Sequence, residues 1–181
     1  MRVISGSARG RKLNAPKGLE TRPTTDRVKE SVFNIISRYL PARFVLDLFA
    51  GSGALGVEAL SRGCKNAVFV DSGKEAACVV KCNVEAAKVT ERATVLCCDY
   101  KVFLESTRKA FDLIFLDPPY NTGLLSDAIL KIEKNALLEP GGIIVAETEH
   151  LGEKPPECGF ETVKFAKYGN TEIYILRNTC S

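Results

Sequence analysis

The stretch FVLDLFAGSGALG, residues 44–56, joins an apolar run to a glycine-rich turn. The run Phe44–Phe49 is apolar except for Asp47, as in a strand buried on both faces of a sheet. Gly51 and Gly53 let the backbone turn tightly and let a ligand approach the start of the next helix. A strand, a tight turn and a helix in this order predict a parallel sheet covered by helices.

The same alternation continues along the chain and predicts an α/β fold. Short apolar runs occur at 44–49, 67–71, 93–97, 111–117 and 142–148, with helices expected at 53–62, 74–88, 100–109 and 123–138. An earlier helix is expected from Asp26 to Leu40, because Thr24 and Thr25 are good N-cap residues and Pro41 ends the helical apolar spacing.

Hairpins are expected near both ends of the chain. Residues 160–167 and 171–177 flank Tyr168-Gly169-Asn170, which predicts a hairpin that adds antiparallel strands to the sheet edge. Residues 2–5 and 11–15 flank Ala8-Arg9-Gly10 and predict a short N-terminal β-hairpin.

Length and composition indicate one ordinary globular domain. A chain of 181 residues with 45% hydrophobic and 26% charged residues suits a single unit, residues 1–181, made of an extension, 1–24, and a core, 25–181. No apolar run approaches the roughly 20 residues that span a bilayer, so no membrane partner is expected. The first residues, Met1–Gly6, lack the apolar segment of a signal peptide, and we expect a cytoplasmic protein.

The seven cysteines form no zinc-binding pattern. Cys78 and Cys82 are four residues apart on an expected helix, but no second pair accompanies them and His150 is the one histidine of the sequence. We therefore predict no metal site and interpret the cysteines as small buried thiols in a reducing compartment.

The basic residues are concentrated at the N-terminus. Residues 1–30 carry eight Lys and Arg side chains and three acids, whereas the remaining residues carry 17 basic and 19 acidic side chains. A basic arm on a nearly neutral body is typical of a protein with a polyanion partner, although a solvated hairpin would look the same. The candidate phosphate contacts are Arg2, Arg9, Arg11, Lys12, Arg22, Arg27 and Lys29. For Arg22 a purely structural role, with Asp26, stays open.

The residues Asp117-Pro118-Pro119-Tyr120 follow the apolar run 111–116. Neither proline has an N–H, so the turn presents a carboxylate, a backbone carbonyl and a ring at the end of a strand. These groups can accept both hydrogens of an exocyclic amino group while the ring stacks on its base. Accepting both hydrogens favours the pyramidal nitrogen of an alkylation transition state over the flat ground state. The motif therefore predicts catalysis at an aromatic amine, with a structural proline-capped turn as the alternative.

Acids at several strand ends suggest which ligand the glycine turn holds. Gly51, Gly53 and Gly56 match a dinucleotide fingerprint and Asp71 matches its ribose-binding acid, so NAD is a competitor. However, Asp47, Asp99 and Asp117 should lie at the same rim, where they would repel a pyrophosphate. S-adenosylmethionine carries a sulfonium and an ammonium group and no phosphate, and acids suit it.

These motifs together resemble the class I S-adenosylmethionine-dependent methyltransferases that act on amino groups. The resemblance implies transfer of the methyl group, which leaves S-adenosylhomocysteine, with Asp117, Pro118, Pro119 and Tyr120 as the catalytic residues. It also implies a set of cofactor-binding residues: Asp47, Phe49, Ala50, Gly51, Ser52, Gly53, Asp71, Ser72, Asp99 and Tyr100.

A closer resemblance covers the whole chain. The segments Met1–Gly6, Arg9–Leu13, Thr21–Glu30 and Phe33–Ile35 resemble the bacterial ribosomal small-subunit methyltransferase D family. This resemblance implies a Rossmann-like, doubly wound seven-stranded sheet of order 3-2-1-4-5-7-6 with an N-terminal hairpin extension. It implies methylation of N2 of one guanine, number 966, of 16S ribosomal RNA in the small subunit or its assembly intermediate. The sequence is silent on oligomeric state, and a small monomer is our default expectation.

Two other functions fit parts of the sequence. A DNA adenine-N6 methyltransferase would use the same catalytic motif, but such an enzyme usually carries a separate target-recognition region. A non-catalytic RNA-binding protein on a Rossmann-like scaffold would explain the basic arm and leave Asp117–Tyr120 without a role.

Overall fold

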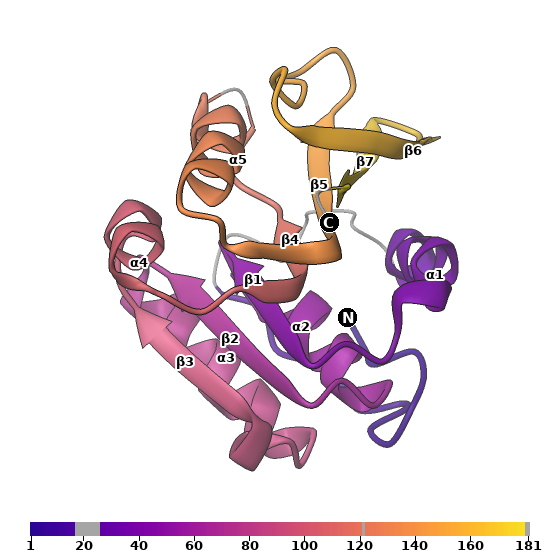
Figure 1. Ribbon diagram of the computed structural model, residues 1–181. Coiled ribbons are helices and arrows are strands. Elements are labelled where there is room, and N and C mark those ends of the chain that lie inside the picture. The colour runs from indigo at the N-terminus through magenta and orange to yellow at the C-terminus, as the bar shows by residue number, and fades with distance from the viewer. Residues whose placement is uncertain (17–25, 121, 180–181) are drawn as a thin grey trace.

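The computed structural model describes residues 1–16, 26–120 and 122–179. Its centre is a seven-stranded sheet of order β3-β2-β1-β4-β5-β7-β6 (Figure 1). The strands β1 to β5 are parallel, and β7 pairs antiparallel with both β5 and β6. The predicted fold class and strand order are confirmed. The strands are β1 Phe44–Leu48, β2 Asn66–Asp71, β3 Ala93–Cys97, β4 Phe111–Leu116, β5 Leu138–Glu149, β6 Phe160–Tyr168 and β7 Thr171–Asn178.

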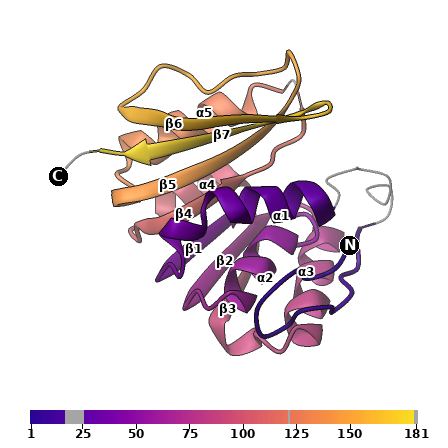
Figure 2. The same ribbon diagram turned by 90° about the vertical axis from the view of Figure 1, so that its right-hand side faces the viewer.

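Helices cover both faces of this sheet (Figure 2). One face carries α1 Asp26–Ile35, α2 Ala54–Ser61 and α3 Lys74–Ala86, and the other carries α4 Tyr100–Ser106 and α5 Leu124–Lys134. Successive residues of a strand point to opposite faces of the sheet and so contribute to two apolar layers. Phe115 packs against Phe33 of α1 with ring centroids 5.7 Å apart, whereas Ile114 is buried in the layer beneath α4 and α5. Short 3-10 turns occur at Ser37–Tyr39 and Thr90–Arg92.

Several element ends differ from the expectations. The helix expected to reach Leu40 ends at Ile35 and continues as the 3-10 turn. The helices expected to end at 109 and 138 end at Ser106 and Lys134. The last of these is shorter because β5 begins at Leu138, opposite Phe111 of β4, and runs through an irregular register before regular pairing resumes.

The N-terminal hairpin is shorter than expected. It consists of one antiparallel bridge, Arg2 with Lys12, and three flanking backbone hydrogen bonds, not of two strands. The extension packs against α2 instead of extending its own pairing. Gly6 lies so close to this helix that a Cβ would stand 1.8 Å from the carbonyl oxygen of Ser61.

A buried carboxylate fixes the extension to the core. Both oxygens of Glu58, in α2, accept backbone hydrogen bonds from the extension, one from Ile4 N at 2.7 Å and one from Ser5 N at 3.0 Å. The same carboxylate pairs with Lys29 Nζ at 3.4 Å and with Arg62 Nε at 2.8 Å, and Glu58 is fully buried. A buried charge needs this number of partners, so Glu58 joins the extension, α1 and α2 into one unit.

The cysteines are mostly not buried, which corrects the expectation. The six that the structure describes are free thiols, of which Cys64 is buried, Cys98 and Cys158 are half-buried, and Cys78, Cys82 and Cys97 are exposed. Within residues 1–16, 26–120 and 122–179, no helix has the length and apolar character needed to cross a bilayer. The same residues contain no cluster of three His, Cys, Asp or Glu side chains suited to a metal ion.

Replacing Glu58 by Gln should destabilise the protein strongly. The substitution leaves the buried Lys29 and its neighbours without their counter-charge, and breaking a buried pair in this way costs about 3–5 kcal/mol. Denaturant unfolding of both proteins at neutral pH measures the difference. Glu105→Gln is the matched control, because the side chain of Glu105 is 60% exposed in its pair with Lys131, and its loss should cost about 1 kcal/mol at most. Equal costs for the two variants would contradict the role of Glu58.

Candidate functional site

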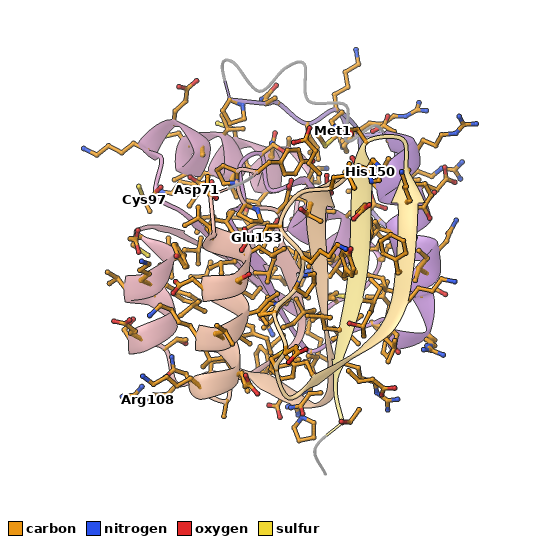
Figure 3. The ribbon with its side chains drawn as sticks, turned by 90° about the horizontal axis from the view of Figure 1, so that it is seen from above. Met1, Asp71, Cys97, Arg108, His150 and Glu153 are labelled. Carbon is orange, nitrogen blue, oxygen red and sulfur yellow. The ribbon has the colours of Figure 1, made fainter. Side chains whose placement is uncertain are left out.

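Acidic residues gather where the parallel strands end. Asp47 pairs in register with Phe69 of β2 and Phe115 of β4, so Asp71 and Asp117 stand two residues further along their strands. Figure 3 shows Asp71 and Cys97 toward one end of the sheet and Arg108, which precedes β4, toward the other. The former end is the carboxyl-terminal rim, the usual ligand site of a doubly wound sheet.

A cavity of about 350 Å³, called the rim cavity below, opens at this end. Its lining includes all but one of the residues predicted to bind a cofactor: Asp47, Phe49, Ala50, Gly51, Ser52, Asp71, Ser72, Asp99 and Tyr100. The exception, Gly53, is the N-cap of α2 and packs beneath the loop, where a Cβ would stand 3.1 Å from Val80.

The loop between β1 and α2 has an unusual backbone. Phe49, Gly51 and Gly53 all have positive φ angles, of 67°, 54° and 73°. For Phe49 this conformation is strained, and such strain persists only where surrounding contacts enforce it. Gly56 gives α2 its close approach to the sheet, because a Cβ there would lie 2.3 Å from the ring of Phe69.

Asp47 is a buried carboxyl group at the base of the rim cavity. It is 3% exposed, and its Oδ2 accepts a hydrogen bond from Gly56 N at 2.9 Å. Burial raises the pKa of Asp47 to about 8, with smaller contributions from Asp117 and Asp71. At neutral pH this group is therefore largely protonated, and a cation bound in the cavity would favour its ionised form.

The other rim acids accept hydrogen bonds that fix their positions. Asp71 accepts Gly51 N and Gly73 N, both at 2.8 Å, which holds the carboxylate against the glycine loop. Asp99 caps α4 through Lys101 N at 2.7 Å. An ionised carboxylate has about four acceptor positions, so Asp71 and Asp99 can each accept further hydrogen bonds from a ligand in the cavity.

Tyr100 forms an apolar wall of the cavity. Its ring packs against Phe49 with centroids 5.0 Å apart, and its hydroxyl donates to Asp127 Oδ2 at 2.7 Å. Burial and this bond raise the pKa of Tyr100, so the hydroxyl stays protonated.

The predicted catalytic motif borders the same cavity. Asp117 and Pro119 line it, while Pro118 is buried beneath the turn. Tyr120 lies outside this lining and donates its hydroxyl to Glu147 Oε1 at 3.4 Å. The Pro119 carbonyl accepts the Thr122 hydroxyl at 2.7 Å.

The predicted phosphate contacts divide into four groups, of which the last is Lys29. Arg2, Arg9 and Arg27 line an exposed groove of about 470 Å³. Arg11 and Lys12 are also exposed, and Arg22 lies outside the described residues.

Lys29 does not fit the expectation of an exposed phosphate contact. It is 1% exposed, donates to the Arg2 carbonyl oxygen and pairs with Glu58, and burial lowers its pKa. The helix that carries it turns this side chain inward, toward the rim cavity. These contacts fix Lys29 between the extension and α2.

The extension builds a part of the site that the sequence patterns did not predict. Met1, Ala15 and Pro16 line the rim cavity. Asn83 of α3, fully buried, holds this segment by exchanging two hydrogen bonds with the backbone of Asn14, at 2.8 and 2.9 Å. Its amide also donates to the Ser52 carbonyl in the glycine loop at 2.8 Å. The sequence signal that could have revealed this contact is Asn83 itself, a polar residue at a position of the helix where an apolar residue is expected.

The doubly wound sheet, with its glycine loop after β1, is a Rossmann-like fold. Solved methyltransferases that are only 13–16% identical to this chain share its fold with TM-scores of 0.64–0.70. At that identity the likeness concerns the fold alone.

The chain belongs to the family described as "Conserved hypothetical protein 95", whose model matches residues 1–177. The Bacillus subtilis protein YlbH is 44% identical over 181 residues, covering 98% of each chain. "Ribosomal RNA small subunit methyltransferase D" of Haemophilus influenzae is 41% identical over 152 residues, covering 82% of this chain and 79% of its own. The solved Escherichia coli protein yhhF is 33% identical with a TM-score of 0.86, over 98% and 97% of the two chains. The family resemblance stated from the sequence is confirmed.

Replacing Asp47 by Asn should change how stability depends on pH. The carboxyl group ionises at about 8 in the folded protein but near 3.8 when unfolded. The wild type should therefore lose stability relative to the variant by roughly 1.4 kcal/mol per pH unit as the pH rises through this window. Denaturant unfolding of the ligand-free proteins at several pH values measures the difference. Parallel stability curves between these pH values would contradict a buried neutral Asp47.

Proposed function

We propose that this protein transfers a methyl group from S-adenosylmethionine to N2 of a guanine in 16S ribosomal RNA of the small subunit. The observation that carries the proposal is the placement of Asp117 and Pro119 on the wall of the cavity that the glycine loop, Asp47 and Asp71 also line. Membership of the family and the name of the Haemophilus influenzae relative support the RNA substrate.

The rim cavity has the chemistry that this cofactor requires. Asp47 and the neighbouring acids suit a ligand that bears positive charge, and the positive-φ glycine loop lets a ligand approach the backbone closely. Asp71 is positioned for ribose hydroxyls, and Asp99 together with the apolar wall of Tyr100 and Phe49 suits a base. When bound, the cofactor supplies an electrophilic methyl group attached to a sulfonium.

The residues of Asp117–Tyr120 would act on the amine. The Asp117 carboxylate and the Pro118 carbonyl accept its two hydrogens, which favours a pyramidal nitrogen whose lone pair points toward the cavity. Tyr120 stacks on the base. Alignment of the two reactants supplies much of the acceleration, on the order of 7–11 kcal/mol in favourable cases. The amine sheds its proton after transfer, so no separate strong base is needed.

The exposed arginines of the extension would hold the RNA. Arg2, Arg9 and Arg27 border one groove, and they would bind phosphates and orient the substrate with little reading of sequence. The target base must leave its stack to reach the motif. We further propose that the chain acts as a monomer and as a single domain.

One experiment separates this function from its rivals. The protein is incubated with a radiolabelled methyl donor and small subunits from an unmethylated strain, and the nucleosides are then analysed. Label in N2-methylguanosine supports the proposal, and label in N6-methyl-2′-deoxyadenosine in a parallel reaction with a DNA substrate supports a DNA adenine methyltransferase. Binding of RNA without any label would indicate a non-catalytic RNA-binding protein.

Asp117→Ala should remove transfer while cofactor binding persists. Losing one acceptor aimed at the reacting group costs about 10²–10³ in kcat. Asp117→Asn keeps an acceptor oxygen and should lose less. Single-turnover kinetics measures transfer, and calorimetry with S-adenosylhomocysteine measures binding. An Ala variant that turns over like the wild type would remove Asp117 from the mechanism.

Arg9→Ala should weaken RNA binding in a salt-dependent way. One lost phosphate contact should raise KM and lower the slope of log affinity against log salt by about 1. Arg108→Ala is the matched control, because this exposed arginine lies toward the opposite end of the sheet (Figure 3). Equal effects of both variants would argue against a defined binding face.

A further inference from the structure

A further carboxylate, that of Glu147, lies in the same row of the sheet as Asp117. Leu116 of β4 pairs with Ala146 of β5, so the next residue of β5, Glu147, stands beside Asp117. Paired positions on adjacent strands are about 4.8 Å apart. Asp117 alternates with the core residue Phe115, and Glu147 alternates with Val145 of the same core layer. The two carboxylates therefore belong to one face of the sheet.

At the position of Glu147, burial of an apolar side chain would cost less free energy than burial of a carboxylate. Glu147 is 4% exposed, and the residues two and four positions before it, Val145 and Ile143, are buried apolar side chains. Burying a carboxylate is unfavourable unless polar partners offset its desolvation. The Tyr120 hydroxyl donates to its Oε1 at 3.4 Å, which ties Glu147 to the catalytic motif. The sheet thus places two neighbouring carboxylates beside the predicted catalytic motif.

Guanine has a matching pair of donors. On its Watson–Crick edge the 2-amino group and N1–H lie side by side and point the same way. Adenine presents an unprotonated N1, whose lone pair would face a carboxylate and be repelled. Two acceptor-only groups next to each other therefore select guanine over adenine, by attraction to one and repulsion of the other.

We propose that Glu147 is a specificity-determining residue that accepts N1–H of the target guanine while Asp117 accepts the 2-amino group. This inference rests on the proposed function and adds to it the side chain that distinguishes guanine from adenine. Glu147 lies outside the lining of the rim cavity, so its role concerns the acceptor base and not the methyl donor.

The test compares two RNA substrates that differ at the methylated position only. One carries guanosine and the other 2-aminopurine riboside, which keeps the 2-amino group but has an unprotonated N1. The wild type should prefer guanosine by roughly 10–100-fold in kcat/KM, since the unprotonated N1 of the analogue offers no hydrogen to the Glu147 carboxylate and its lone pair is repelled by it. Glu147→Gln can donate its amide N–H to N1 of the analogue, so its preference should fall to a few-fold. The ratio within one protein preparation does not depend on its active fraction.

Two further variants separate direct recognition from a structural role. Glu147→Asp keeps an acceptor-only group and should keep the preference for guanosine. Should the Gln variant lose turnover or S-adenosylhomocysteine binding, the Asp variant decides: a kept preference supports recognition and a lost one overturns it. Tyr120→Phe removes the hydroxyl that Glu147 holds. If this variant lowers the preference as much as Glu147→Gln does, Glu147 acts through Tyr120 and the proposal fails.

The remaining outcomes are equally decisive. The inference is overturned if the wild-type ratio of kcat/KM for guanosine over the analogue is near one, or if this ratio is unchanged in the Gln variant. In both cases, formation of N2-methylguanosine by the wild type would leave the proposed function intact. Absence of N2-methylguanosine from the wild type on the guanosine substrate overturns the proposed function itself, and the inference falls with it.

Discussion

Parallel pairing of β1 with β2 and β4 is the constraint on which the rest of the molecule depends. It brings Asp47, Asp71 and Asp117, which are far apart in sequence, to one rim in fixed relative heights. The same pairing places the glycine loop among them, because α2 must start where β1 ends. Burying a carboxyl group at this rim is unfavourable for its ionised form, and the raised pKa of Asp47 reflects first that burial and then the nearby charges of Asp117 and Asp71. A cationic ligand would relieve this cost.

The extension turns an open rim into a walled cavity. Glu58 fixes residues 4 and 5 against α2, while Asn83 fixes Asn14 and the glycine loop together. Both anchors are fully buried polar groups whose hydrogen bonds to the extension are made with backbone atoms. The arm proposed to hold RNA is thus built into the wall of the proposed cofactor site. Changes at either anchor should be felt at both places, because one rigid segment serves the two.

Sequence patterns predicted the fold well where local periodicity determines structure. The strands, the helices and the antiparallel end hairpin agree with the structure, since buried parallel strands are short apolar runs that end at polar residues. The strand order also agrees, but it was implied by the family resemblance and not by local periodicity. Element ends were less predictable. Leu138 starts β5 although Pro140 and Gly141 follow it, because pairing with β4 outweighs the local preference for a turn. Lys29 was assigned to the surface because a helix pattern does not show which neighbours a charge will meet.

The sequence by itself determined the order of elements, the acids at their ends and the family, because each depends on residues close together in the chain or on whole-chain similarity. Only the tertiary structure decided which distant groups meet: the burial of Lys29 against Glu58, the wall built by Met1, Ala15 and Pro16, and the place of Glu147 beside Asp117. These contacts depend on strand register and on the docking of the extension. Both arise from packing between segments far apart in the sequence, which no local pattern encodes.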